Sequence, residues 1–157
     1  MAHRSRLVRW GRWIVAALSV ALIAIQFVPV ERTNPPVLMD VDAPPDVARI
    51  LRRSCYDCHS YESRWPWYAH VAPMSWLVTS HVNEARGDLN FSDWPAFDFV
   101  LQNEALEDIR KEVKSGDMPL ASYLWIHWDA RLSERDRATL LDWAVPAAPP
   151  GESELYD

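Results

Sequence analysis

The sequence predicts a mostly α-helical protein in which one N-terminal transmembrane helix precedes a small helical domain. Three observations favour this fold class. An uncharged, apolar run extends from Trp13 to Val30. Several later segments repeat apolar residues every three or four positions, the period of a helix that buries one face. No segment shows the strict apolar–polar alternation of a half-buried strand.

The N-terminal run, WIVAALSVALIAIQFVPV, has 18 residues and no charge. As a helix it would be roughly 27 Å long, close to the hydrocarbon thickness of a bilayer. Four arginines precede the run and Glu31 follows it, which places the N-terminus in the cytoplasm by the positive-inside rule. No clean A-x-A cleavage site closes the run, so an uncleaved anchor is favoured over a signal peptide. We expect a single-pass inner-membrane protein with a periplasmic domain.

Composition divides the chain into four parts. Residues 1–30 are a basic flank and the membrane anchor, and residues 31–45, with two Pro-Pro pairs, read as an extended stalk. Residues 46–145 form the domain, and residues 146–157 read as a disordered acidic tail. The net charge is −6, and because residues 1–32 carry +4, the remainder carries −10. An acidic domain argues against a nucleic-acid partner.

Start and stop signals predict four helices in the domain. The first starts at Asp46 as N-cap and ends at the CYDCH stretch; the second lies between Pro73 and Gly87. The third runs from about Phe97 to Ser115 with Gly116 as its C-cap, and the last starts near Ser133, with Asp136 completing a capping box.

Apolar periodicity predicts which face each helix buries. The second helix carries a stripe with helical spacing, made of Met74, Leu77, Val78, His81, Val82 and Ala85. The last helix is expected to bury Leu140, Leu141 and Ala144, with Trp143 beside them.

The chain's only two cysteines stand in the sequence C-Y-D-C-H. This is the attachment signature of c-type haem. Two thiols three residues apart at a helix end face the same way and can both reach the vinyl groups of one porphyrin. His59 lies one turn after Cys55 and can reach the iron. The motif therefore predicts one covalent haem c per chain, with Cys55 and Cys58 as tethers and His59 as proximal iron ligand.

Other uses of this motif are less well supported. A structural zinc site needs four ligands, and the chain has no second cysteine pair. A thioredoxin-like dithiol occurs next to a βαβ unit, and the sequence predicts no such unit. A disulfide between residues this close closes only a very small loop.

Met118 is the first candidate for the second axial position. It lies in the sequence GDMP between two predicted helices, where a loop methionine can approach a ring held by the first helix. Two histidines remain as alternatives. His81 lies on the apolar stripe, and His127 lies among three large apolar residues just after the methionine loop.

Four segments of the domain resemble the small membrane-anchored haem-binding domain proteins of bacteria. In order, they read SCYDCHSYESRWPWYAHVAPMSWLV, HVNEARGDLNFSDW, VKSGDMPLASYLWIH and ARLSERDRATLLDWA, and they cover most of residues 46–145. The WPWY and LNFSDW pieces are more specific than the CxxCH motif. The resemblance implies that Cys55, Cys58 and His59 attach the haem and that Met118 matches the family's G-x-M-P element. At one position the chain departs from many relatives, because Trp128 follows His127 where a proline is expected.

The second half also resembles class I cytochromes c, which have a Met-Pro loop before a terminal helix. The fold expected is therefore a cytochrome c-like helical domain around one haem. The function expected is single-electron transfer between the membrane and an unidentified redox partner protein, with no catalytic residue. The alternatives are a haem-based sensor, a small-ligand binder or a weak peroxidase, each of which needs an open sixth position.

Overall fold

The computed structural model describes residues 2–95 and 98–147, with side chains from Val8 onward. It is mostly helical, and its described part contains no strand, only an isolated bridge between Met39 and Asp93. The chain forms two compact units. One contains the N-terminal segment through Arg32 together with Trp65–His81, and the other contains Thr33–Arg64 and the chain from Val82 onward. The predicted fold class is confirmed.

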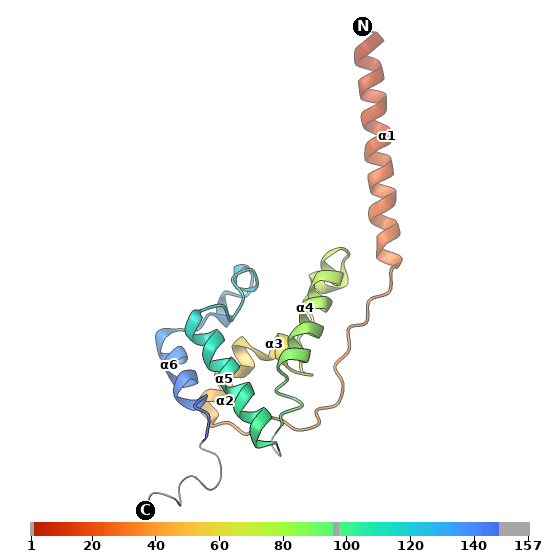
Figure 1. The fold of residues 1–157 in the computed structure, drawn as a ribbon. Coiled ribbons are helices and arrows are strands. Elements are labelled where there is room, and N and C mark those ends of the chain that lie inside the picture. Colours follow the sequence, from red (N-terminus) through yellow and green to blue (C-terminus); the bar gives the residue numbers. More distant parts are fainter. Residues whose placement is uncertain (1, 96–97, 148–157) are drawn as a thin grey trace, which may run out of the picture. The chain divides into compact units, whose positions relative to one another are not determined.

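The N-terminal unit is built on α1 (Ala2–Ala24), which continues into a short 3-10 turn, η1 (Ile25–Phe27). The segment Val8–Phe27 is the one described helix long and apolar enough to cross a membrane, with a mean hydropathy of 1.6 and no buried side chain. The same unit contains η2 (Trp67–His70) and the first half of α4 (Met74–Asp88). Figure 1 shows α1 in red and α4 in green.

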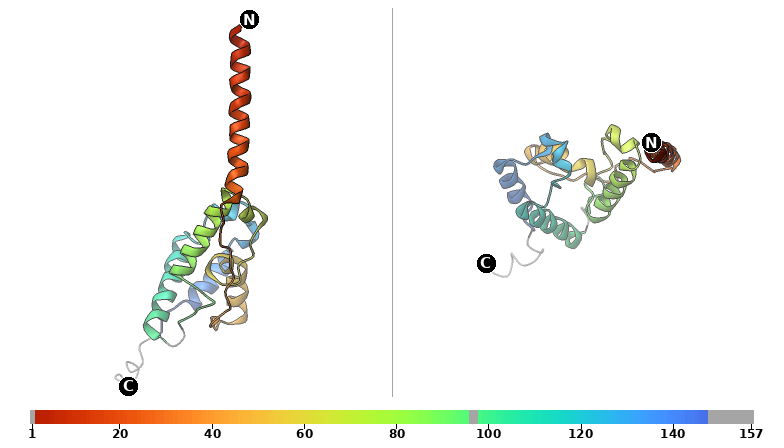
Figure 2. Two further views of the ribbon diagram at one scale, coloured as in Figure 1. Left: turned by 90° about the vertical axis from the view of Figure 1, so that its right-hand side faces the viewer. Right: turned by 90° about the horizontal axis from the view of Figure 1, so that it is seen from above.

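The second unit is a helical domain whose core lies among three helices. These are α2 (Pro45–Ser54), α5 (Phe99–Ser115) and α6 (Glu134–Trp143), with α6 packed against both of the others (Figures 1 and 2). A turn, α3 (Tyr56–His59), follows α2, and two 3-10 turns, η3 (Tyr123–Trp125) and η4 (Trp128–Ala130), precede α6. The buried core comprises Val41, Val47, Ile50, Leu51, Tyr56, Phe91, Trp94, Ile109, Val113, Leu132, Leu140 and Ala144.

An aromatic stack fixes the interior of this domain. Phe91 lies parallel to Tyr56 with ring centroids 5.3 Å apart, and to Trp94 at 6.1 Å. Trp94 in turn contacts Trp143 of α6 at 6.4 Å. Rings of this size supply much of the apolar area that a small domain can bury.

The expected stalk is partly a piece of the domain. Val41 is buried, and its amide donates to the carbonyl of Phe91 at 3.0 Å, while the amide of Leu38 donates to that of Ser92 at 2.9 Å. Trp94 donates back to the carbonyl of Met39 at 2.9 Å. Residues 31–44 form no helix and Pro45 already belongs to α2, and residues 38–41 pair with the domain. The disordered tail expected at 146–157 lies outside the described residues from 148 onward.

Two helix-end predictions are confirmed. Gly116 follows α5 with φ of 83°, in the left-handed region that glycine adopts without strain. Ser133 and Asp136 form the reciprocal capping box at the start of α6. Burial opposes ionisation of Asp136, but hydrogen bonds from Ser133 and an ion pair with Arg53 at 2.9 Å outweigh it, lowering the pKa of Asp136 to about 2.

The first helix also ends at the CYDCH stretch as predicted, because Cys55 leaves the helical backbone after Ser54 with φ of −124°. Two other helix-end predictions are wrong. Asp46 makes no capping bond, because Pro44 is the N-cap and the helix already starts at Pro45. Gly87 does not end the second helix, which extends to Asp88. The third helix starts at Phe99, capped by Asp98, and the predicted start at Phe97 lies outside the described residues.

The predicted buried stripe on the second helix is wrong for its first half. Met74 and Leu77 are exposed, and so is His81. Ser75 and Thr79 are buried there instead. The last helix behaves as predicted, since Leu140 and Ala144 are buried and Leu141 packs against the core.

Candidate functional site

The CxxCH motif folds into a single tight turn at the end of α2. The carbonyl of Cys55 accepts hydrogen bonds from the amides of both Cys58, at 3.1 Å, and His59, at 2.9 Å. Because one carbonyl closes the turn, His59 lies one helical turn beyond Cys55. The carbonyl of His59 then accepts from the amide of Phe91 at 2.8 Å, which ties the turn to the aromatic core.

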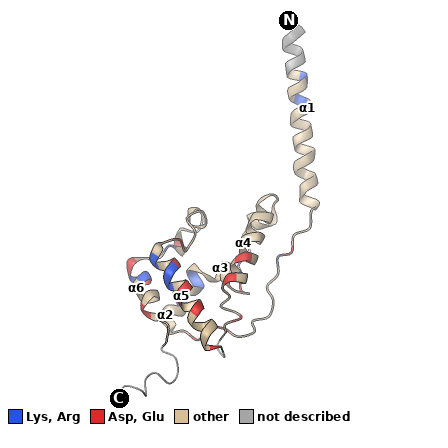
Figure 3. Ribbon diagram, in the orientation of Figure 1, with Lys and Arg blue, Asp and Glu red and all other residues tan. Residues whose placement is uncertain are grey.

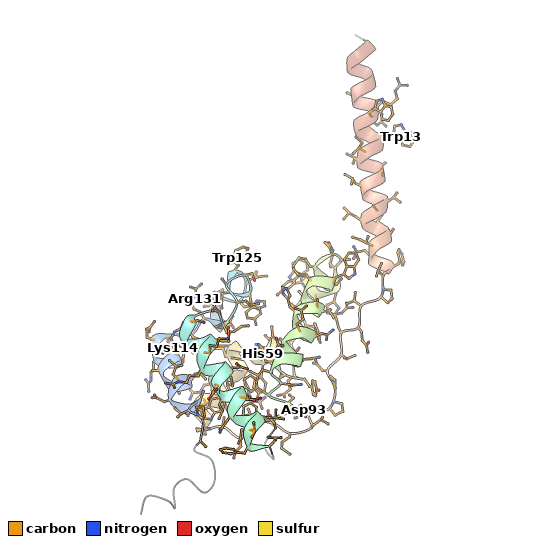
Figure 4. The ribbon with its side chains drawn as sticks, viewed as in Figure 1. Trp13, His59, Asp93, Lys114, Trp125 and Arg131 are labelled. Carbon is orange, nitrogen blue, oxygen red and sulfur yellow. The ribbon has the colours of Figure 1, made fainter. Side chains whose placement is uncertain are left out.

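The imidazole of His59 is held by two backbone carbonyls at the end of α4 (Figure 4). Its Nδ1 lies 3.0 Å from the oxygen of Ala85 and 3.1 Å from that of Leu89. Carbonyl oxygens only accept, so Nδ1 carries the hydrogen and Nε2 keeps its lone pair. Burial lowers the pKa of His59, against a smaller opposite effect of these hydrogen bonds. The ring is therefore the neutral, oriented imidazole that binds metals.

The two cysteines are free, half-buried thiols. Burial raises the pKa of Cys55 to about 12 and that of Cys58 to about 11. Thiols with raised pKa values are poor nucleophiles and poor zinc ligands at neutral pH, since both roles need the thiolate. Among the described side chains, no group of three or more His, Cys, Asp or Glu residues is arranged to hold a metal ion.

A cavity of about 470 Å³ lies beside this turn, entirely within the second unit. This volume is in the range of cofactor sites. Cys55, His59 and Met118 all line it. Most of its wall is apolar and comes from Leu51, Phe91, Ile109, Val113, Leu132 and Leu140. The structure thus brings together one cysteine, the histidine and the methionine that the sequence singled out, around one apolar space.

Met118 reaches the cavity because α5 ends abruptly. In its left-handed conformation, Gly116 donates its amide to the carbonyl of Glu112 at 3.2 Å, and the amide of Met118 donates to the same oxygen at 3.3 Å. This turn folds the chain back over the last turn of α5, where Val113 lines the cavity. Met118 is half-buried.

The remaining predicted site residues lie elsewhere. Cys58 belongs to the same turn but is not part of the cavity wall. His127 stacks on Tyr123 with ring centroids 4.0 Å apart, and its Nδ1 lies 3.2 Å from the carbonyl of Tyr123. His81 belongs to the other unit and is exposed.

Asp57 is a feature of the site that the sequence analysis missed. It stands between the two cysteines, and its carboxylate accepts from the backbone and guanidinium of Arg64 at 3.0–3.1 Å. It also accepts from the hydroxyl of Tyr123 at 2.9 Å. Because Tyr123 follows Met118 by five residues, this bond ties the methionine segment to the cysteine turn. An acidic residue inside the motif was the only sequence signal of this role.

Three carboxylates also line the cavity and were not predicted: Asp88, Asp108 and Glu112. No lysine or arginine is part of the described lining. Apart from Ser54 and His59, the polar side chains of the wall are therefore acidic. These acidic positions lie on helices α4 and α5 without a distinguishing motif in the sequence.

The comparisons with known proteins agree with this site. A family model described as a haem-binding domain matches residues 20–145. No curated protein and no solved structure matches the chain. The matched range begins inside α1 and ends after α6, so it contains the cysteine turn, the cavity and the methionine loop.

Proposed function

Because this chain belongs to the haem-binding domain family, we propose that it is a membrane-anchored c-type haem protein that transfers single electrons. Bound haem supplies an iron that changes between the ferrous and ferric states by one electron. The chain's residues attach this group, ligate it and exclude water from it. No nucleophile or general base is assigned to the site.

The observation that carries the proposal is the orientation of His59. Its Nδ1 hydrogen is fixed between two carbonyl oxygens, and the ring lines an apolar cavity. Nε2 has no hydrogen bond among the described residues and is the atom left to bind iron. A ligand histidine with its other nitrogen bonded to backbone carbonyl is the usual arrangement at metal sites.

Cys55 and Cys58 are the proposed tethers. Each would hold the haem through a thioether bond to one of its vinyl groups. Cys55 lines the cavity directly, and Cys58 lies one turn of backbone away in α3, which Cys55 precedes as N-cap.

Met118 would supply the second protein ligand to the iron. The turn at Gly116 and the bond between Tyr123 and Asp57 hold its segment against the cavity from both sides. Methionine opposite histidine raises the reduction potential of a haem, as suits an electron carrier. His81 and His127 remain alternatives, although His127 is engaged with Tyr123.

The helix Val8–Phe27 is the proposed anchor. Its 20 residues span about 30 Å as a helix, which is the hydrocarbon thickness. Four arginines before Trp13, of which Arg9 and Arg12 lie in the first turns of this helix, predict a cytoplasmic N-terminus and a domain on the other side of the membrane. The proposed partner is a redox protein on that side.

The test is the visible and near-infrared spectrum of the full-length ferric protein, produced with a haem-ligating export pathway and purified in detergent. A low-spin spectrum with the sulfur-to-iron charge-transfer band is expected, and Met118→Ala should abolish that band while His127→Ala keeps it. A low-spin spectrum without the band assigns the ligand to a histidine. A high-spin spectrum favours ligand binding or sensing. Absence of covalent haem refutes the proposal.

A further inference from the structure

One segment of the N-terminal unit is free of charge over an unusual length. Between Arg64 and Glu84 the chain contains no Asp, Glu, Lys or Arg, although these make up 24% of the protein. The prolines and the late start of α4 at Met74 rule out a second membrane-spanning helix in this stretch. In Figure 3 the turn before α4 and the start of that helix show neither blue nor red.

The segment also has an inverted distribution of polarity. Trp67 is 78% exposed and Leu77 is 48% exposed, with Val71, Met74 and Trp76 exposed as well. The side chains buried within it are small or polar: Ala69, Ala72, Ser75 and Thr79. The hydroxyl of Thr79 is buried without a hydrogen-bond partner among the described residues. A contiguous exposed surface of large apolar groups marks a contact with something other than water.

The segment is fastened to the end of α1 by a side chain. Gln26 accepts from the amide of Ala72 at 2.9 Å and donates to its carbonyl at 3.1 Å. Its amide nitrogen also lies 2.9 Å from the carbonyl of Leu22, one turn earlier. Gln26 is the last residue but one of the span Val8–Phe27, so the tether is at the depth where that span leaves the hydrocarbon.

We propose that Trp65–His81 lies in the membrane interface at the C-terminal end of α1, with its exposed face in contact with phospholipid. This inference rests on the proposed anchor. Tryptophan is enriched at this depth because its ring is amphipathic. Trp10 and Trp13 stand near the opposite end of the same helix, and Figure 4 labels Trp13 there. The segment, called the collar below, then fixes how deeply α1 is inserted in the bilayer.

The observations favour lipid over a protein occupant. A second copy or a partner subunit would be expected to find charged or hydrogen-bonding groups at the rim of the surface. The exposed face here has no Asp, Glu, Lys or Arg across the whole segment, and its exposed polar side chains are limited to His70, Ser80 and His81. Its attachment to the proposed membrane-spanning helix, within one compact unit, places it against the bilayer without a further partner.

Photo-crosslinking from lipid tests the proposal. The full-length, haem-loaded chain is placed in phosphatidylcholine nanodiscs that contain a phospholipid with a diazirine near its glycerol end. Trypsin releases Trp65–Arg86 as one peptide, because cleavage follows Arg64 and Arg86. The control is the peptide Ser115–Arg131, which carries the exposed Trp125 and Trp128 in the other unit.

Lipid adducts are expected on Trp65–Arg86 and on α1, with few on the control peptide. Adducts on α1 alone would overturn the collar and leave the anchor standing. Adducts on neither would overturn the anchor and the collar with it. Equal adducts on both tryptophan peptides, or cross-links from Trp65–Arg86 to a second protein chain, would also overturn the proposal.

Two matched variants test the tether. Gln26→Leu removes the bonds to Ala72. One neutral hydrogen bond changes an equilibrium constant, here that for docking of the segment at α1, by about fivefold. Adducts on Trp65–Arg86 should therefore fall by about that factor, while those on α1 persist. Gln102→Leu makes the same change on α5, outside the segment, and should leave the adduct pattern unchanged. An unchanged yield in Gln26→Leu would show that the tether does not position the segment.

Discussion

The hydrogen bond from Tyr123 to Asp57 should stabilise both the domain and the proposed ligation of haem iron by Met118. The substitution Tyr123→Phe removes only the hydroxyl that lies 2.9 Å from the carboxylate. Burial, then the charge of Asp57, raises the pKa of Tyr123 far above its ordinary value, so the hydroxyl remains a donor at all working pH values. The variant therefore reports on one charge-assisted bond.

The expected loss follows from what remains at Asp57. A hydrogen bond to a charged group contributes about 1.5–3 kcal/mol. The Asp57 side chain is 16% exposed and keeps its three bonds from Arg64, so its charge is not left without partners. The lower end of the range applies, and Tyr123→Phe should destabilise the domain by about 1.5 kcal/mol, roughly tenfold in the unfolding equilibrium.

The assay is urea unfolding of the full-length haem protein in detergent, followed by tryptophan fluorescence and by the sulfur-to-iron band. The band should disappear at a lower urea concentration than the fluorescence changes, because the bond holds the methionine segment to the cysteine turn. The control is Tyr61→Phe, whose ring lies under Arg86 with 5.4 Å to its centroid and keeps that contact as Phe. If Tyr123→Phe unfolds like Tyr61→Phe, the reasoning is refuted.

Three further predictions concern single positions. Gly116→Ala should cost about 1–2 kcal/mol in unfolding free energy, since φ is 83° there, whereas Gly87→Ala, inside α4 with open space around it, should be neutral or stabilising. Asp136→Asn should remove part of the pH dependence of the unfolding free energy. The folded pKa of Asp136 is about 2, below the ordinary 3.8, so its carboxylate stabilises the domain by about 1–2 kcal/mol above pH 4. This stabilisation is lost as the pH falls toward 2, which unfolding measured across that pH range would show. Glu112→Gln, at the cavity wall, should raise the reduction potential by on the order of 30 mV, and the exposed Glu107→Gln on the same helix should leave it unchanged.

Local chemistry made some features of the fold predictable. The capping box at Ser133 and the left-handed Gly116 depend on residues a few positions apart, and both are as expected. The start of the first helix was predicted wrongly. Proline is favoured at the first helical position, so the helix begins at Pro45, and Asp46 lies inside it instead of capping it. Periodicity correctly predicted an apolar stripe on α4. The same pattern occurs whether such a face contacts protein, lipid or water, so it did not predict which of them covers the stripe.

The identity of the main site residues was predictable from the sequence, but the contacts that orient them were not. The order of Cys55, His59 and Met118 in the chain indicated the cofactor, and the structure lines one cavity with all three. What orients them comes from distant segments. The carbonyls of Ala85 and Leu89 hold the imidazole from a helix 26–30 residues away, and Tyr123 reaches Asp57 across 66 residues. Backbone carbonyls carry no sequence signature, so such support appears only in three dimensions.

The two sides of the cavity are held differently, and this has a consequence for the proposed electron carrier. His59 is fixed by main-chain atoms at the end of α4 and by the turn it belongs to, so its orientation does not depend on any one side chain. The methionine side depends on Gly116 and on the single hydroxyl of Tyr123, in a segment whose tip, Trp125 and Ile126, is exposed. Perturbation should therefore release Met118 before it disturbs His59. In the proposed electron carrier, the His59 side of the site would therefore set whether haem is held, and the methionine side would set its potential and the access of other ligands to the iron.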